Sequence, residues 1–154
     1  SVSLTGGEPL LQTEFLKKFL PKCTLPVYLE TNATLADNLA EIIEFVDYIS
    51  ADIKLPSCSG NKELWKEHDA FFKIASQKKC FAKIVFDENI NDAEIINCSR
   101  LGKKYDMELI LQPKNTKEFI KPDMTFVESV LNKFLQNYNQ VRIIPQVHKI
   151  LEIR

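Results

Sequence analysis

The chain has 154 residues, of which 45% are hydrophobic, and its formal net charge is −1. A chain of this length can bury one hydrophobic core, so we expect a single domain over residues 1–154. The near-zero charge argues against nucleic acid or a membrane surface as an obligatory partner. No apolar run approaches the roughly 20 residues that span a bilayer, and no signal-peptide pattern is present. These features predict a cytoplasmic globular protein.

Short apolar runs alternate with amphipathic stretches along the whole chain. Strand–helix alternation of this kind is typical of parallel strands joined by right-handed crossovers. Because the strand-like runs are apolar throughout, we expect both faces of the sheet to be covered. The predicted fold is α/β, a partial (βα)6 TIM-type barrel whose curved sheet has helices on its outer face. The strands are expected near residues 2–4, 27–30, 48–54, 81–86, 109–112 and 141–145.

The turn after the first predicted strand is the most informative local feature. Gly6 and Gly7 lack a Cβ, so they can adopt positive φ and let a ligand touch the main chain. Glu8 follows them, and Pro9 suits the first position of a helix. Taken alone, this pattern fits a tight strand-to-helix turn with a surface glutamate equally well.

Polar residues occur where the predicted strands end, and ligands of parallel α/β folds bind outside those carboxyl ends. Asp52 and Lys54 are two positions apart, so they share one face of their strand. Gln112 and Gln146 could instead cap strand ends without binding a ligand. His148 could instead be a partly buried, hydrogen-bonded histidine. His68, in a helical stretch, is expected to be a solvated or packing residue. The candidate site residues are Gly6, Gly7, Glu8, Thr31, Asn32, Asp52, Lys54, Gln112, Gln146 and His148.

The four cysteines do not form a metal motif. Cys23, Cys58, Cys80 and Cys98 are scattered, and the two closest lie 18 positions apart. Zinc sites and iron–sulfur loops need closely spaced ligands, so we expect no metal site in this chain. We expect all four to be ordinary reduced cysteines.

The order of these motifs resembles the radical S-adenosylmethionine superfamily. Leu4–Pro9 resembles its Gly-Gly-Glu-Pro motif, whose backbone holds the amino group of the cofactor's methionine. Glu30–Thr34 resembles a following Glu-Thr-Asn-Gly-Thr strand end, with Ala33 in place of the usual glycine. Asp52–Lys54 resembles an Asp-x-Lys element whose lysine pairs with the cofactor carboxylate. The resemblance implies that Gly6, Gly7, Glu8, Thr31, Asn32, Asp52 and Lys54 bind S-adenosylmethionine.

The C-terminal sequence narrows the resemblance. Arg142–Lys149 contains Pro-Gln-x-His-Lys and, with Leu111–Pro113, is most similar to the 7-carboxy-7-deazaguanine synthase family. The resemblance implies rearrangement of 6-carboxytetrahydropterin to 7-carboxy-7-deazaguanine, with loss of ammonia, for queuosine biosynthesis. It also implies a 4Fe-4S cluster, support by Mg²⁺ and an electron donor such as flavodoxin. Gln112, Gln146 and His148 would then bind the pterin-like substrate.

One part of the family pattern is missing. The Cys-x-x-x-Cys-x-x-Cys loop that precedes the Gly-Gly-Glu-Pro strand is not in this sequence. We therefore expect the C-terminal part of a radical S-adenosylmethionine core, lacking the first βα unit and inactive alone. Its first strand would have an exposed edge, so we expect a homo-oligomer that covers it. A glycyl-radical activating enzyme, which Asp52 and Lys54 also suit, and a non-catalytic α/β binding domain remain alternatives.

Overall fold

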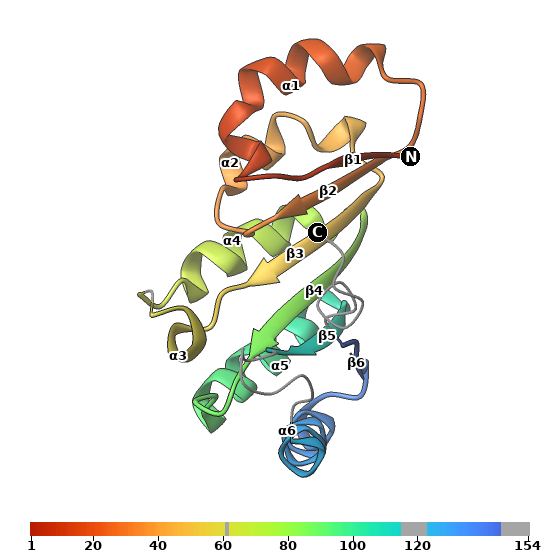
Figure 1. Ribbon diagram of the computed structural model, residues 1–154. Helices are drawn as coiled ribbons and strands as arrows, with labels where there is room; N and C mark the ends of the chain where they lie inside the picture. Colours follow the sequence, from red (N-terminus) through yellow and green to blue (C-terminus); the bar gives the residue numbers. More distant parts are fainter. Residues whose placement is uncertain (61, 115–122, 146–154) are drawn as a thin grey trace.

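The computed structural model describes residues 1–60, 62–114 and 123–145. Its strands form one parallel sheet in which each strand lies beside the next one along the chain (Figure 1). This sequential order means that every crossover steps in the same direction, as in a (βα) barrel. The six strands are β1 (Val2–Leu4), β2 (Val27–Thr31), β3 (Tyr48–Ile53), β4 (Lys79–Phe86), β5 (Glu108–Pro113) and β6 (Val141–Ile143).

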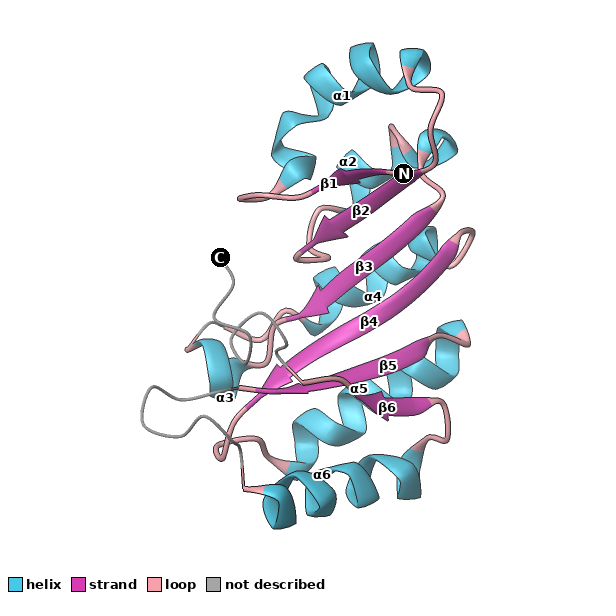
Figure 2. Ribbon diagram, turned by 45° about the vertical axis from the view of Figure 1, so that its right-hand side comes forward, coloured by secondary structure: helices cyan, strands magenta, loops and turns pink. Residues whose placement is uncertain are grey.

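Helices connect the strands on the outer side of the sheet. Figure 2 shows α2, α4 and α5 behind the strands, with α1 and α6 toward the two ends of the sheet. This arrangement confirms the predicted fold of six parallel strands with outer helices. The α-helices are α1 (Thr13–Phe19), α2 (Ala36–Ala40), α3 (Pro56–Ser59), α4 (Trp65–Ala75), α5 (Asp92–Tyr105) and α6 (Met124–Asn137), and the 3₁₀-helices are η1 (Pro9–Gln12), η2 (Leu20–Lys22) and η3 (Ile43–Phe45).

The two longest helices, α5 and α6, begin at side chains that cap them. Asn91 accepts a hydrogen bond from the Glu94 backbone, and the Glu94 side chain accepts one from the Asn91 backbone, so α5 starts with a capping box. Asp123 caps α6 by accepting from the Thr125 backbone at 2.9 Å. These caps satisfy backbone N–H groups that have no partner inside the helix.

The two faces of the sheet differ in burial along some of its strands. Along β2 and β4, side chains alternate between buried and partly exposed positions. Leu29 and Ile84 are fully buried on the helix side, whereas Glu30 and Lys83 lie on the opposite, inner face. On β3 and β5 the inner-face residues Ser50 and Ile110 are each 4% exposed. The expected cover on both faces is therefore found at these positions, but not at Glu30 and Lys83.

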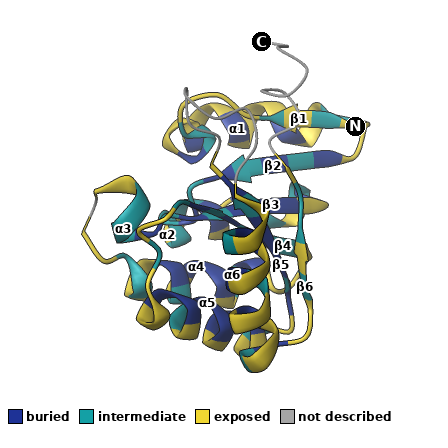
Figure 3. Ribbon diagram, turned by 60° about the horizontal axis from the view of Figure 1, so that its bottom comes forward, coloured by how far each residue is buried: buried dark blue, intermediate teal, exposed yellow. Residues whose placement is uncertain are grey.

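The buried side chains form one cluster between the sheet and the helices. Figure 3 shows the buried residues in the middle strands and along α4 and α5. Phe71 and Phe72 of α4 and Phe86 of β4 are among its largest members, and each is 0% exposed. This core fixes the helices against one face of the sheet.

Within the described ranges, none of the helices combines the length and the apolar composition needed to cross a membrane.

Candidate functional site

The turn after β1 presents open main chain. Gly6 has φ +113°, which L side chains rarely adopt, so glycine is required there. A Cβ on Gly6 or Gly7 would meet no atom within 4 Å, and both residues are exposed. A ligand can therefore approach this backbone closely. The predicted positive φ is confirmed at Gly6.

Glu8 joins the end of β1 to the end of β2. Its Oε2 accepts a hydrogen bond from the Asn32 backbone N–H at 2.8 Å, and its Oε1 accepts from Thr31 Oγ1 at 2.8 Å. Oε1 also accepts from the Leu10 N–H at 3.1 Å, which caps η1. Both carboxylate oxygens are thus occupied by protein donors. Glu8 acts here as a connector between two strand ends.

The turn after β2 is held by its own side chains. Asn32 Oδ1 accepts from the Thr34 N–H at 3.2 Å and from Thr34 Oγ1 at 2.6 Å. Ala33, where the resembling motif has glycine, is buried and has φ +56°. A left-handed alanine is strained, so the surrounding contacts must hold the turn in place.

A charged cluster lies at the end of β3. Asp52 Oδ2 is 2.8 Å from Lys54 Nζ, and Asp52 Oδ1 is 2.9 Å from Lys83 Nζ. The predicted placement of Asp52 and Lys54 on one face is confirmed. Two ammonium groups share one carboxylate, so the cluster keeps an excess positive charge that suits an anionic ligand.

Lys83 was not predicted as a site residue. It pairs with Asp52 through the register of β3 and β4. A lysine in the middle of the apolar run of β4 was the signal that could have identified it, because such a charge needs a partner.

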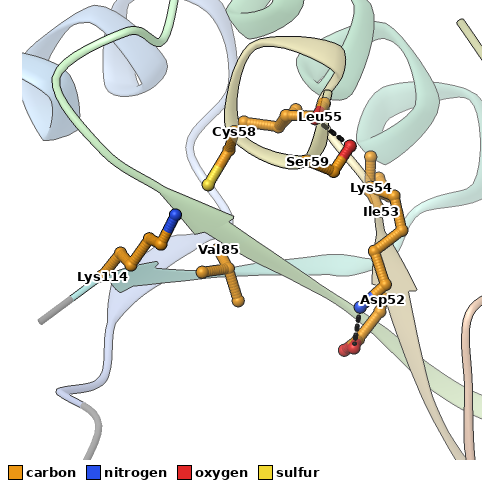
Figure 4. A pocket seen from close by; sticks show the side chains of 8 residues that line it. All are labelled: Asp52, Ile53, Lys54, Leu55, Cys58, Ser59, Val85 and Lys114. Atoms are coloured by element: carbon orange, nitrogen blue, oxygen red, sulfur yellow. Dashed lines mark hydrogen bonds and ion pairs between the residues drawn. The ribbon is translucent and has the colours of Figure 1, made fainter. Parts of the chain in front are cut away.

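A pocket of about 270 Å³ opens beside this cluster, between β3, β4 and α3. Figure 4 shows Cys58 Sγ and Lys114 Nζ directed toward one another across it. Burial raises the pKa of the Cys58 thiol, and its hydrogen bond to Asp87 raises it further, so the thiol stays protonated. The pocket is lined by Asp52, Ile53, Lys54, Leu55, Cys58, Ser59, Val85 and Lys114.

Helix α3, which carries Cys58, is anchored by a buried carboxylate. Glu94 is 4% exposed; its Oε1 accepts from the Ser57 N–H at 2.9 Å and its Oε2 from Ser57 Oγ at 2.7 Å. Sequence reasoning missed this contact. The Asn-x-x-Glu spacing of residues 91–94 identifies a capping glutamate but does not reveal its second partner.

His68 was predicted to be a solvated or packing residue, and the structure decides between the two. Its side chain is 0% exposed, and both ring nitrogens have polar neighbours. It is therefore a buried, hydrogen-bonded residue. No local sequence pattern around Glu67 and Asp69 indicated this, because the hydrogen-bond partners of His68 lie in the turns after β2 and β3.

The predicted substrate-side residues are only partly described. Gln112 is partly exposed on β5, and its Cα partner on β4 is Val85, which lines the pocket. Gln146 and His148 lie outside the described residues. Among residues 1–60, 62–114 and 123–145, no group of three or more histidine, cysteine or acidic side chains is arranged to hold a metal ion. The described part of the chain thus brings open glycine main chain and paired lysines to the carboxyl side of the sheet.

The chain is similar in sequence to curated proteins named 7-carboxy-7-deazaguanine synthase. No family model matches the chain. The chain is 41% identical over 159 residues to 7-carboxy-7-deazaguanine synthase of Geobacter sulfurreducens, covering 98% of this chain and 62% of that protein. It is 33% identical to the synthase of the same name from Archaeoglobus fulgidus, covering 100% of this chain and 67% of that protein. The chain thus spans about three fifths to two thirds of these relatives.

A solved structure agrees on the fold. The crystal structure of archaeal TYW1 matches with a TM-score of 0.59 at 21% identity, over 89% of this chain and 50% of that one. At this identity the match supports the partial-barrel architecture alone. The whole-chain identities to the curated relatives carry the family assignment: the chain belongs to the 7-carboxy-7-deazaguanine synthase family.

Proposed function

We propose that the full-length protein is a radical S-adenosylmethionine enzyme that converts 6-carboxytetrahydropterin to 7-carboxy-7-deazaguanine. The observation that carries the proposal is the joined set of strand ends after β1, β2 and β3. There, open glycine main chain follows β1, and Lys54, which shares one carboxylate with Lys83, follows β3. The kinship to the synthases supports the same assignment.

The first wall of the site would bind the methionine end of S-adenosylmethionine. The main chain of Gly6 and Gly7 offers polar groups to the amino group, and Lys54 offers an ammonium to the carboxylate. Asp52 orients that ammonium, and Lys83 compensates Asp52 from the next strand. When bound, S-adenosylmethionine and a 4Fe-4S cluster supply radical chemistry, while the residues of this chain bind and orient the reactants.

The second wall would hold the pterin. The pocket beside α3 offers the Lys114 ammonium to an anionic substrate, and Gln112 offers a donor and an acceptor to a pterin edge. Gln146 and His148 would complete this wall.

The 154 residues alone are proposed to be inactive, because the four scattered cysteines cannot supply three ligands to one cluster. The cluster, Mg²⁺ and an electron donor such as flavodoxin are proposed for the full-length enzyme. We also propose that a second copy covers the edge strand β1, beside which Leu11 and Phe15 are 68% and 61% exposed. A monomer by light scattering at high concentration would contradict that assembly.

The test is anaerobic reconstitution of the full-length protein with iron and sulfide, followed by mass spectrometry of its products. We expect 5′-deoxyadenosine and 7-carboxy-7-deazaguanine from the pterin substrate. Cleavage of S-adenosylmethionine without conversion of the pterin would contradict the synthase assignment.

Two substitutions test the assignment of the walls. Lys54→Ala removes the charge opposite a partly buried carboxylate, so S-adenosylmethionine binding should weaken at least tenfold with folding intact. Gln146→Ala should spare uncoupled cleavage and impair turnover of the pterin. Lys66→Ala, on the exposed side of α4, is the matched control and should change neither. Normal binding by Lys54→Ala together with lost binding by Gln146→Ala would reverse the two walls.

A further inference from the structure

His68 lies on α4 behind the strand ends, outside the two walls described above. It is fully buried and packs against Trp65, at a ring-centroid distance of 6.3 Å, and against Phe72 at 6.4 Å. A polar ring in such surroundings needs hydrogen-bond partners, because an unpartnered buried polar group costs free energy. Its partners therefore define its role.

Both ring nitrogens contact the backbone of predicted cofactor-binding turns. The Lys54 backbone N–H donates to Nε2 at 3.4 Å, and Nδ1 lies 3.0 Å from the Ala33 carbonyl oxygen. A backbone N–H can only donate, so Nε2 is the acceptor. Nδ1 then carries the proton and donates to Ala33, which fixes one neutral tautomer of the ring.

These two contacts extend the link that Glu8 makes between β1 and β2. Glu8 accepts from the Asn32 N–H, Ala33 follows Asn32, and His68 joins Ala33 to Lys54. One chain of hydrogen bonds therefore runs across the ends of three neighbouring strands. One of its members is Lys54, which the proposed function assigns to the carboxylate of S-adenosylmethionine.

We propose that His68 is a positioning residue: from behind the sheet it holds the left-handed Ala33 turn and the Lys54 backbone at a fixed separation, so that the cofactor-binding wall is assembled before the ligand arrives. This inference rests on the proposed function. A wall ordered in advance loses less conformational freedom on binding, so the ligand binds more tightly. Without His68, the two turns would become ordered only when S-adenosylmethionine binds, and its affinity would be lower.

The ionisation of His68 fits this role. Burial lowers its pKa, the Ala33 carbonyl and Glu67 act in the opposite direction, and the Lys54 ammonium lowers it again. Glu67 on α4 and Lys54 at the end of β3 are the charged groups that act on the ring. The pKa of His68 therefore lies below the ordinary histidine value of 6.5, so the ring is neutral at pH 7. At acidic pH, protonation of Nε2 would place its N–H against the Lys54 N–H and break this hydrogen bond.

The experiment compares three variants of the full-length protein by calorimetric titration with S-adenosylmethionine. His68→Leu removes both hydrogen bonds and should weaken binding at least fivefold. His68→Gln restores a donor and an acceptor on one planar amide and should recover most of the affinity. Lys66→Leu, at an exposed position of the same helix, is the control, and it should leave S-adenosylmethionine affinity unchanged.

Two readouts separate positioning from a general loss of packing. Because burial lowers the pKa of His68, wild-type affinity should stay constant from neutral pH through the ordinary titration range of histidine and fall only at more acidic pH, whereas the affinity of His68→Gln should not follow that profile. In the ligand-free wild type, nitrogen NMR of the ring should show a protonated Nδ1 and an unprotonated Nε2. These two measurements need no folded His68→Leu variant.

The outcomes distinguish the inference from the function on which it rests. Lack of S-adenosylmethionine binding by the wild type would overturn both. Normal wild-type binding, together with unchanged affinity in His68→Leu or with the opposite tautomer in the wild type, would overturn the positioning role alone.

Discussion

The two walls of the proposed site are held together in different ways. On the β1–β3 side, Glu8 and His68 connect the strand ends through hydrogen bonds to backbone groups, and His68 is fully buried. On the other side, a charged pair follows the ends of β4 and β5: Lys114 Nζ, on a side chain that is 43% exposed, lies 3.3 Å from Asp87.

The difference has a physical consequence. Hydrogen bonds that satisfy buried backbone groups are costly to break, since the abandoned donor or acceptor has no water to replace its partner. Exposed ion pairs contribute little to stability because water and salt compete with them. The first wall is therefore rigid before binding, while side chains of the second can rearrange around a substrate. This division suits a common cofactor on one side and a specific substrate on the other.

The largest effect is expected when the connector of the first wall is removed. Glu8→Ala leaves the Asn32 N–H, the Thr31 hydroxyl and the Leu10 N–H without their acceptor. We expect the free energy of unfolding to fall by about 3 kcal/mol, measured by urea denaturation. The matched control is Glu14→Ala, whose side chain is 81% exposed and should change stability by less than about 0.5 kcal/mol.

Equal losses in Glu8→Ala and its control would show that the first wall does not depend on this carboxylate. The comparison between a rigid and an adjustable wall would then fail.

A smaller loss is expected at the anchor of α3, which borders the second wall. Glu94→Gln keeps the shape of the side chain but replaces one acceptor oxygen with a donor that faces the donors of Ser57 and Asn91. We expect a loss of about 2 kcal/mol in urea denaturation. Glu88→Gln, at an exposed position, is the control and should be neutral. A neutral Glu94→Gln would mean that α3 is not held by this contact.

The sequence predicted most of the fold because the relevant signals are local. Alternating apolar runs and amphipathic stretches located the six strands, and their single-step order followed from the crossover rule. Boundaries shifted by one or two residues: β4 begins at Lys79 and β3 ends at Ile53. The period of two placed Asp52 and Lys54 together, as the structure confirms.

The contacts that join the strand ends were not predictable in the same way. Glu8 meets Asn32 24 positions away, and His68 meets Ala33 35 positions away. Such pairs depend on strand register and on the angle at which α4 packs, which no local pattern encodes. For the same reason the sequence suggested a glutamate in the site but not that its oxygens are already occupied by protein donors.

The smallest effect on stability should come from the charged pair of the second wall. Lys114→Met removes the ammonium beside Asp87, but that carboxylate keeps hydrogen bonds from the Asn89 N–H at 3.1 Å and from Asn89 Nδ2 at 3.0 Å. The urea midpoint should therefore be unchanged within error. Because Lys114 lines the pocket, KM for the anionic pterin should rise severalfold in the full-length enzyme while S-adenosylmethionine affinity stays the same. A fall in stability comparable to that of Glu94→Gln would show that the second wall is as rigid as the first, and unchanged KM would remove Lys114 from the substrate side.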